Sequence, residues 1–556
     1  MSRSATGSEP KTSQLTLVAA ADAAAAALPD RELVVQGDRR FTYAQIADRS
    51  RRLASYLRSR GLGCRTERSA LAGHEVGQDL LGIYAYNGPE FVEGLIGSFR
   101  ARVAPFNVNY RYVRSELQYL LVDSGATALI YHAAFAPTLA EVLAELPDLR
   151  VLIQIADDSG NELLDGAVDY ESVVASTEPD PLLPQPSPDD LYVLYTGGTT
   201  GMPKGVLWRQ HDIFMAACGG RDNNTGAVVE SVAEIAARAG ANPGVNLMIL
   251  PPLIHGAAQW AVFTAMTTGQ TIVFSSVVDR IDAGEIVRTI ERERVSIVIV
   301  VGDAVARPLL AAIETRTADV SSLVALASGG AVLSPAVKQR FIDAIPGLIV
   351  LDAVGASETG AQLHHVSGAG FVSTGTFAAG TDTCVVAEDF GSVLAPGHDG
   401  IGWLAQRRFT PLGYKGDAAK TAATFPLIGG VRFVLPGDRA RHLDNGSIEL
   451  LGRDAVTINS GGEKIFVEEV EMAISSHPAV ADVVVVGRPS ERWGQEVVAV
   501  VASNTKVSAE DLIAHAAKSI ARYKLPKAVV FRPEIVRSPV GKADYRWARE
   551  QAVAAG

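Results

Sequence analysis

A strand that runs directly into a glycine- and threonine-rich loop constrains this chain more than any other feature. Residues 191–206 read Leu-Tyr-Val-Leu-Tyr-Thr-Gly-Gly-Thr-Thr-Gly-Met-Pro-Lys-Gly-Val. The first residues are strand formers, whereas the glycines, threonines and proline that follow disfavour regular structure and leave backbone N–H groups free. Such N–H groups, together with hydroxyls and an ammonium group, can surround an anion. We therefore predict a phosphate-binding loop that contains Thr196, Gly197, Gly198, Thr199, Thr200, Gly201 and Lys204.

This loop is not a Walker A loop, in which the lysine directly follows a glycine and is itself followed by a hydroxyl residue. Here Pro203 precedes Lys204 and Gly205 follows it. A plain surface turn between two strands is the alternative interpretation. The ten-residue loop resembles the signature of the adenylate-forming superfamily, which contains acyl-CoA synthetases, peptide-synthetase adenylation domains and beetle luciferases.

Length and composition limit the class of protein. A chain of 556 residues is too long for one ordinary core, so two or more domains are expected. A net charge of −12 gives no reason to expect nucleic acid as a partner. No window reaches the roughly 18 apolar residues of a transmembrane helix. Three widely spaced cysteines argue against a zinc site or a disulfide framework and suit the cytoplasm.

The pattern along the chain predicts a large and a small domain. Residues 1–14 are expected to be a disordered tail. Strand and helix patterns alternate between residues 296 and 353, which predicts a parallel sheet with helices on its faces. The fold class is therefore α/β: a large N-terminal domain with layered, parallel-rich sheets over residues 15–453, and a small, mobile α+β domain over residues 454–556.

Two predicted strands of this sheet end in short motifs that resemble ligand-binding segments. Ligands bind at the strand ends of such sheets. Residues 328–331 read Ser-Gly-Gly-Ala and resemble the family's segment on the adenine face, which implies Gly329, Gly330 and Ala331. Residues 352–358 resemble its aromatic-Gly-x-Thr-Glu motif, with Val354 in place of the aromatic residue. The resemblance implies that Asp352 accepts from the adenine amine, that Ser357 replaces the threonine, and that Glu358 holds Mg²⁺, a cation that prefers oxygen ligands.

The resemblance continues into the second half of the chain. It implies that Asp438 accepts from both ribose hydroxyls and that Arg453 reaches the ribose and phosphates, roles that suit a carboxylate and a guanidinium group. The usual hinge residue after that arginine is replaced by Ala455. Near the C-terminus, Lys542 follows Gly541 as in the family's terminal loop, whose lysine acts in adenylation, although Arg537 stands in the place of the motif's proline.

The acid and the thiol are assigned to two further segments. His255 ends an apolar stretch, where a hydrogen-bonded core histidine is the ordinary interpretation. The family's counterpart lies where the carboxylate enters, so we predict a substrate-site role for His255 and Gly256. Gly461 and Gly462 suit a tunnel wall along which a pantetheine arm passes close to the backbone.

Together these matches imply an ATP-dependent acyl-CoA synthetase. Such an enzyme activates a hydrophobic carboxylic acid as an acyl-adenylate, transfers the acyl group to CoA, and releases AMP and pyrophosphate. ATP, Mg²⁺ and CoA are the expected cofactor and co-substrates; Lys542, Thr196 and Glu358 are the expected catalytic residues. The resemblance leaves a homodimer open. The alternatives are a ligase that loads a carrier-protein thiol and an inactive nucleotide-binding homologue.

Overall fold

The computed structural model describes residues 15–197, 202–222, 225–315, 318–330, 333, 335–372, 376–453, 457–536 and 545–555. Several predicted features lie outside these residues: the tail over residues 1–14, the hinge at Ala455, and the site residues Gly198, Thr199, Thr200, Gly201, Ala331 and Lys542.

Two of the three sheets belong to the large domain. The 15-stranded sheet begins with strands that are mostly parallel and continues as antiparallel ribbons. Its order is β2 (Arg39–Thr42), β1 (Glu32–Gln36), β11 (Thr271–Phe274), β10 (Asn246–Ile249), β12 (Ile297–Val300), β13 (Ala325–Gly329), β14 (Ile349–Ala356), β15 (Gly360–Ser367), β16 (Thr376–Ala379), β23 (Ile448–Arg453), β22 (Asp438–His442), β18 (Gly402–Arg407), β21 (Val431–Val434) and β20 (Leu427–Ile428), with β17 (Thr383–Val386) beside β18.

The 8-stranded sheet carries the predicted phosphate-binding loop. Its order is β19 (Gly413–Tyr414), β9 (Pro203–Arg209), β8 (Leu191–Gly197), β4 (Ala104–Asn107), β3 (Leu80–Tyr84), β5 (Ala128–His132), β6 (Val151–Ile155) and β7 (Ala167–Asp169).

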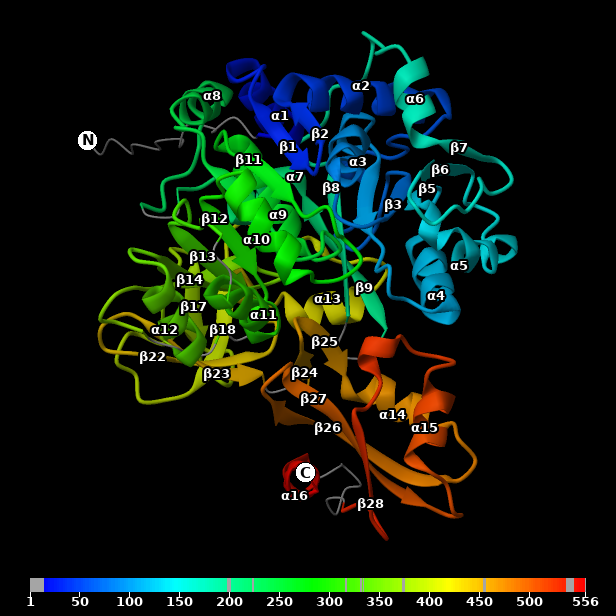
Figure 1. Cartoon of the computed structure of the whole chain (residues 1–556), viewed down its shortest axis with the longest axis vertical. Helices are drawn as coiled ribbons and strands as arrows, with labels where there is room; N and C mark the ends of the chain where they lie inside the picture. The colour runs from blue at the N-terminus through cyan, green and yellow to red at the C-terminus, as the bar shows by residue number, and fades with distance from the viewer. Residues whose placement is uncertain are drawn as a thin grey trace, which may run out of the picture.

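The third sheet forms the small domain and has five strands. Its order is β25 (Glu463–Phe466), β24 (Thr457–Ser460), β27 (Gly494–Ser503) and β26 (Val480–Ser490), with β28 (Ala528–Phe531) parallel to β27. In Figure 1 this domain, in orange and red, lies below the large domain. The expected division into a large α/β domain and a small α+β domain is therefore confirmed.

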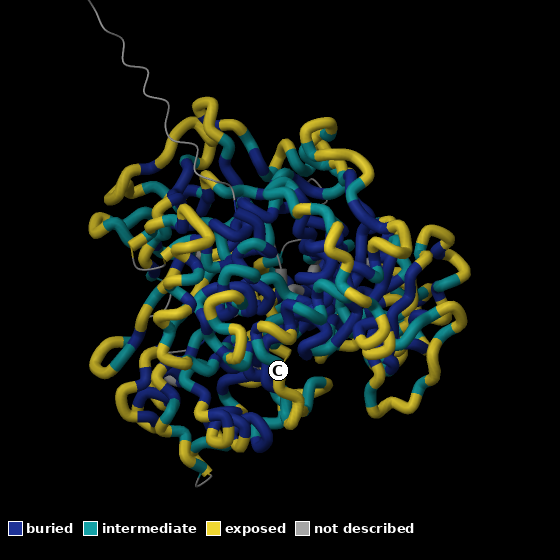
Figure 2. The backbone as a smooth tube through the Cα atoms, turned by 90° about the horizontal axis from the view of Figure 1, so that it is seen from above, coloured by how far each residue is buried: buried dark blue, intermediate teal, exposed yellow. Residues whose placement is uncertain are grey.

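Helices cover the sheets, and the buried backbone gathers inside the large domain with exposed turns outside (Figure 2). The helices of the large domain are α1 (Leu17–Ala27), α2 (Tyr43–Ser59), α3 (Pro89–Arg100), α4 (Arg114–Ser124), α5 (Ala136–Ala140), α6 (Tyr170–Ser176), α7 (Gln210–Ala217), α8 (Val232–Gly240), α9 (Gly256–Thr267), α10 (Ala283–Arg292), α11 (Gly302–Thr315), α12 (Pro335–Ala344) and α13 (Ala418–Thr424). Those of the small domain are α14 (Val467–Ser475), α15 (Ala509–Ala516) and α16 (Tyr545–Ala554). None of the helices in the described part of the chain is long and apolar enough to span a membrane.

The alternation expected between residues 296 and 353 is present as β12, α11, β13, α12 and β14, with all three strands parallel. The strands are mostly apolar, and Val298, Leu326 and Val350 are buried in one core with residues of α10, α11 and α12. Their common direction places the ends of β13 and β14 side by side, with Gly329 opposite Ala353. The predicted adenine segment therefore begins at the end of β13, whereas the predicted magnesium motif begins inside β14 and ends just after it, at Glu358.

The packing of α2 against α3 gives a stability prediction. A methyl group on Gly97 of α3 would lie 2.8 Å from Leu53 Cδ2 and 3.1 Å from the Ser50 carbonyl oxygen, both on α2. We expect Gly97→Ala to destabilise the large domain by about 1–3 kcal/mol, because the two buried helices must move apart. Thermal unfolding of the purified variant measures the effect.

Gly240→Ala is the matched control, since Gly240 ends α8 and a methyl group there would meet nothing within 4 Å. An unfolding midpoint for Gly97→Ala equal to that of wild type would contradict the predicted close contact between the helices.

Candidate active site

The predicted phosphate-binding loop connects two strands of one hairpin. β8 and β9 pair in antiparallel fashion, with Thr196 opposite Lys204 and Gly197 opposite Pro203. The strand predicted before the loop is confirmed, and a second strand follows it. The hairpin therefore fixes both ends of the loop at the ends of two paired strands of the sheet.

Lys204 forms an ion pair with Asp417, which precedes α13. Asp417 also caps this helix, because its Oδ1 accepts from Lys420 N at 2.9 Å. The hydrogen bond from Lys204 lowers the pKa of the Asp417 carboxyl. The lysine is thus held at the base of the loop by a carboxylate that the sequence analysis did not identify.

Glu358 lies beside the same hairpin. The Tyr414 hydroxyl donates to Glu358 Oε1 at 2.8 Å, and Tyr414 belongs to β19, where it faces Val206 of β9. On the other side, Trp208 Nε1 of β9 donates to the Ser357 carbonyl oxygen at 2.8 Å. Two contacts from one sheet therefore bring the expected magnesium motif to the phosphate-binding hairpin.

Asp352 has a protein partner in the structure. Its Oδ2 accepts from Lys338 Nζ at 2.5 Å, and both side chains are largely buried. Burial raises the pKa of the Asp352 carboxyl, although the hydrogen bond from Lys338 acts in the opposite direction. An adenine amine at this position would share the carboxylate with an ammonium group, a competition that the motif alone did not reveal.

The two residues assigned to the ribose lie opposite each other. Asp438 begins β22 and Arg453 ends β23, and their backbone positions are paired across the antiparallel ladder. Directly opposed residues on one face of a sheet are about 5 Å apart. A hairpin therefore brings together two residues that the sequence analysis assigned to one sugar.

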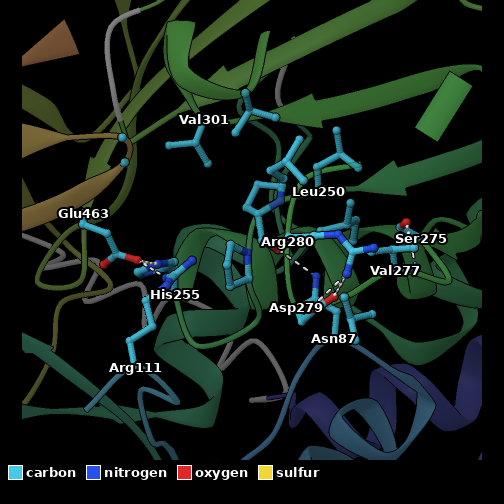
Figure 3. Close-up of a pocket in the computed structure, with 18 of the residues that line it drawn as sticks. Asn87, Arg111, Leu250, His255, Ser275, Val277, Asp279, Arg280, Val301 and Glu463 are labelled. Atoms are coloured by element: carbon cyan, nitrogen blue, oxygen red, sulfur yellow. Dashed lines mark hydrogen bonds and ion pairs between the residues drawn. The ribbon is translucent and has the colours of Figure 1, made fainter. Parts of the chain in front are cut away.

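A pocket of about 180 Å³ is lined by residues of both domains (Figure 3). The large domain contributes Arg111, His255 and Val301, and the small domain contributes the Gly461-Gly462-Glu463 turn and Trp493. Three of the four residues predicted to serve the acid and the thiol, His255, Gly461 and Gly462, are therefore in one cavity. Gly256 is not part of this wall: it begins α9 and packs near Leu194 and Trp260.

Glu463 joins the two domains at the pocket. His255 Nε2 lies 3.5 Å from Glu463 Oε1, and the Arg111 guanidinium group forms an ion pair with the same oxygen atom. Burial alone would raise the pKa of this carboxyl, but His255, Arg111 and Lys524 outweigh it and lower the pKa to about 2. Glu463 therefore remains charged while it is enclosed between two cationic partners and an imidazole.

Gly462 of the small domain lies against Val301 of the large domain. Its φ is +85°, and a Cβ atom on it would lie 2.2 Å from Val301 Cγ1 of the large domain. Both the left-handed backbone and the contact exclude a side chain. The structure thus gives a steric reason for a glycine at position 462, namely the contact with Val301. Passage of a pantetheine arm along this wall stays a prediction.

Sequence patterns did not single out five ionisable residues at these sites: Arg111, Lys338, Tyr414, Asp417 and Glu463. A local signal existed for two of them. Asp417 stands at a helix start, and Glu463 directly follows the two glycines. Nothing in the local sequence pairs Arg111 with Glu463, which lies 352 positions away.

The donor set near the hairpin fits magnesium better than a softer metal. Among the described residues, no three His, Cys, Asp or Glu side chains are grouped so that they could hold a metal ion. Glu358 offers a single hard carboxylate, and Mg²⁺ is commonly bound by one or two carboxylates together with substrate phosphates and water. The residues present therefore fit a metal that arrives with a phosphate ligand.

Comparison with known proteins identifies the family. The model of the AMP-binding enzyme family matches residues 21–410, and that of the AMP-binding enzyme C-terminal domain matches residues 469–542. The medium-chain acyl-CoA ligase Mig of Mycobacterium avium is 71% identical over 544 residues, which cover 98% of this chain and 99% of the relative. The 3-oxocholest-4-en-26-oate–CoA ligase of Rhodococcus rhodochrous is 40% identical over 539 residues, which cover 94% and 93% of the two chains.

A solved structure has the same fold. A double mutant of o-succinylbenzoate CoA synthetase (MenE) from Bacillus subtilis superposes with a TM-score of 0.76 at 20% identity, over 96% of this chain and 98% of that chain. The resemblance inferred from the phosphate-binding loop is thus confirmed over nearly the whole length. The chain belongs to the AMP-binding enzyme family, and within it to the AMP-forming acyl-CoA ligases.

Proposed function

We propose that this ligase makes the CoA thioester of a medium-chain fatty acid in two half-reactions. First, the carboxylate attacks the α-phosphate of ATP, which forms the acyl-adenylate and releases pyrophosphate. Second, the thiol sulfur of CoA attacks the acyl carbonyl, which forms the thioester and releases AMP. The observation that carries the proposal is the pocket at which the Gly461-Gly462 turn of the small domain meets His255 of the large domain.

The choice of acid rests on the relatives. The relative at 71% identity is named for medium-chain acids, whereas the one at 40% identity is named for a steroid acid. We therefore place a medium-chain fatty acid first and a steroid side-chain acid second. Both are hydrophobic carboxylates, so the same two half-reactions apply to either.

The first half-reaction is assigned to residues around the β8–β9 hairpin. Thr196, Lys204 and the loop between them surround the phosphates, while Asp438 and Arg453 hold the ribose. Lys542 stabilises the charge that develops on the α-phosphate. Glu358, positioned by Tyr414, would hold Mg²⁺, which when bound offsets the negative charge of the phosphates.

The second half-reaction is assigned to the small domain. We place its start after Arg453 and infer that it turns between the half-reactions, so that Lys542 serves the first and Gly461-Gly462 the second. In the pocket Trp493 is flanked by two cations, with Arg492 Cζ 4.6 Å and Lys527 Nζ 5.9 Å from the ring centre. These cations favour the phosphates of CoA over a carrier-protein thiol. A cytoplasmic location and a homodimer remain predictions from the sequence.

One experiment tests the proposal directly. Pyrophosphate exchange is measured with fatty acids of increasing length and with a steroid side-chain acid, and thioester formation is then measured with CoA. We expect exchange and thioester formation to be greatest for medium-chain acids. Exchange without thioester formation would support the carrier-protein alternative, and no exchange with any acid would support an inactive homologue.

Lys542→Ala is expected to impair the first half-reaction and to spare the second. Its ammonium group is expected to act on charge that peaks in the adenylation transition state, and loss of such a donor typically costs about 100- to 1000-fold in rate. Thioester formation from synthetic acyl-adenylate and CoA should stay within several-fold of wild type. Each half-reaction is assayed alone, and equal losses in both would remove Lys542 from its assigned role.

Gly462→Ala is expected to impair the second half-reaction and to spare the first. The added methyl group would strain a left-handed backbone and collide with Val301, so the turn could not dock as observed. We expect thioester formation to fall by roughly 10- to 100-fold, with adenylation little changed.

Two companion variants sharpen the Gly462 test. Val301→Ala removes the atom that the methyl group would meet and should restore part of the activity of Gly462→Ala. Gly446→Ala is the control for strain alone, because Gly446 has φ +80° and open space around it. A Gly462→Ala enzyme with normal thioester formation would refute the close contact.

Glu358→Gln tests the metal ligand. The amide keeps the shape and can still accept from Tyr414, but it lacks the charge that holds a hard cation against phosphate. We expect adenylation to fall and to recover in part at high Mg²⁺. Titration of pyrophosphate exchange with Mg²⁺ measures the shift, and a curve that superposes on that of wild type would exclude Glu358 as the ligand.

A further inference from the structure

A buried charge cluster fastens the two domains together away from the pocket. Lys524 belongs to the 3₁₀ helix η4 (Arg522–Lys524) of the small domain, and its Nζ lies 2.6 Å from Glu116 Oε1 of the large domain. The same Nζ lies 2.7 Å from Glu469 Oε1 of α14. The side chains of Lys524, Glu116 and Glu469 are only 5%, 5% and 7% exposed.

The two ion pairs of this cluster differ in one respect. Lys524 and Glu469 both belong to the small domain, so their pair moves with that domain as a unit. Glu116 lies in the first turn of α4, and its Oε2 also accepts from Val113 N at 3.1 Å, which fixes the carboxylate to the large domain. The Glu116–Lys524 contact therefore exists only while the domains are docked as observed.

The cluster contains one carboxylate more than it has cations. Burial raises the pKa of the Glu469 carboxyl to about 7, which Lys524 opposes and Glu116 reinforces. Glu469 Oε2 is buried and has no hydrogen-bond partner among the described residues. Removal of a cation from between two buried carboxylates is costly, because each charge is then left without compensation. Loss of Lys524 should therefore destabilise the docked state more than loss of one partner of an exposed ion pair would.

Further contacts between the two domains surround Lys524. Tyr112 and Tyr523 are partly buried, and their rings lie 5.2 Å and 5.6 Å from Lys524 Nζ. Asn109 Nδ2 donates to the Tyr523 hydroxyl at 3.2 Å, and Arg111 of the same segment pairs with Glu463 at the pocket. One stretch of the large domain therefore receives both the pocket turn and Lys524.

We propose that Lys524 is a positioning residue for the second half-reaction, which acts through Glu116 to hold the small domain with Gly461-Gly462 at the pocket. This inference rests on the proposed two-step function. Lys524 touches neither the acid nor the thiol: it selects a domain position. Its loss therefore reduces the fraction of enzyme that is competent for thioester formation, while adenylation, assigned to another domain position, is not reduced.

Glu116→Gln is the variant that tests the proposal, because the amide keeps the size of the side chain and can still accept from Val113 N. We expect thioester formation from synthetic acyl-adenylate and CoA to fall roughly 10- to 100-fold, as the docked population falls. Pyrophosphate exchange should stay within about twofold of wild type. Glu145→Gln is the matched control. Glu145 makes an exposed ion pair with Arg114, which lies on the same helix as Glu116, and its described bonds are all within the large domain.

A double-mutant cycle guards against a general loss of structure. In Lys524→Met the two carboxylates face each other without a cation, so Glu116→Gln should improve thioester formation in that background and impair it in wild type. Additive effects, or equal losses in both half-reactions, would overturn the proposal.

A distance measurement keeps the inference separate from the proposed function. Spin labels are placed at the exposed positions Asp148 and Lys518 in a Cys64→Ser background, and pulsed dipolar spectroscopy is recorded with CoA and a non-hydrolysable acyl-adenylate analogue bound. Wild type and Glu145→Gln should share one dominant distance, which Glu116→Gln depopulates. An unchanged distribution in Glu116→Gln overturns the role of Lys524, whereas a wild-type enzyme that forms no thioester overturns the proposed function instead.

Discussion

The carboxylate of Glu463 is the contact on which the described arrangement of the pocket depends. It lies within reach of His255 and Arg111 of the large domain and remains ionised despite its burial, because these partners and Lys524 compensate its charge. Removal of any partner would leave part of that charge unpaired, which is costly in a buried site. The turn that carries Gly461 and Gly462 is therefore held at the pocket wall by electrostatics, and the lack of a side chain on Gly462 leaves room for the side chain of Val301.

The 8-stranded sheet organises the other half of the site. Its edge strand β19 and the neighbouring strand β9 carry Tyr414, Lys204 and Trp208, which contact Glu358, Asp417 and Ser357, respectively. Residues from the phosphate loop, the magnesium motif and the start of α13 thus converge at one sheet edge. Among the described residues, Lys204, Trp208 and Tyr414 each contact a polar group of another segment, which fixes the three segments relative to one another.

Much of this arrangement could be predicted from the sequence, because it is encoded locally. Apolar runs separated by helical patterns predicted the parallel strands β12, β13 and β14. The phosphate-binding loop was recognisable from its own residues. The pairing of Lys338 with Asp352 was not, since neither residue carries a signal for the other. The contact of Glu116 with Lys524 joins positions 408 residues apart and depends on how two domains meet.

The side chains that join the two domains are mostly polar. Arg111, Glu116, Glu463 and Lys524 are charged, and the accompanying contacts of Asn109 with Tyr523 and of Ser115 with Ser519 are polar. Water can hydrate all of these groups, and interfaces of this polar kind permit relative domain motion. If the small domain turns as proposed, these hydrophilic side chains become exposed to water, and their hydration offsets part of the cost of breaking the contacts.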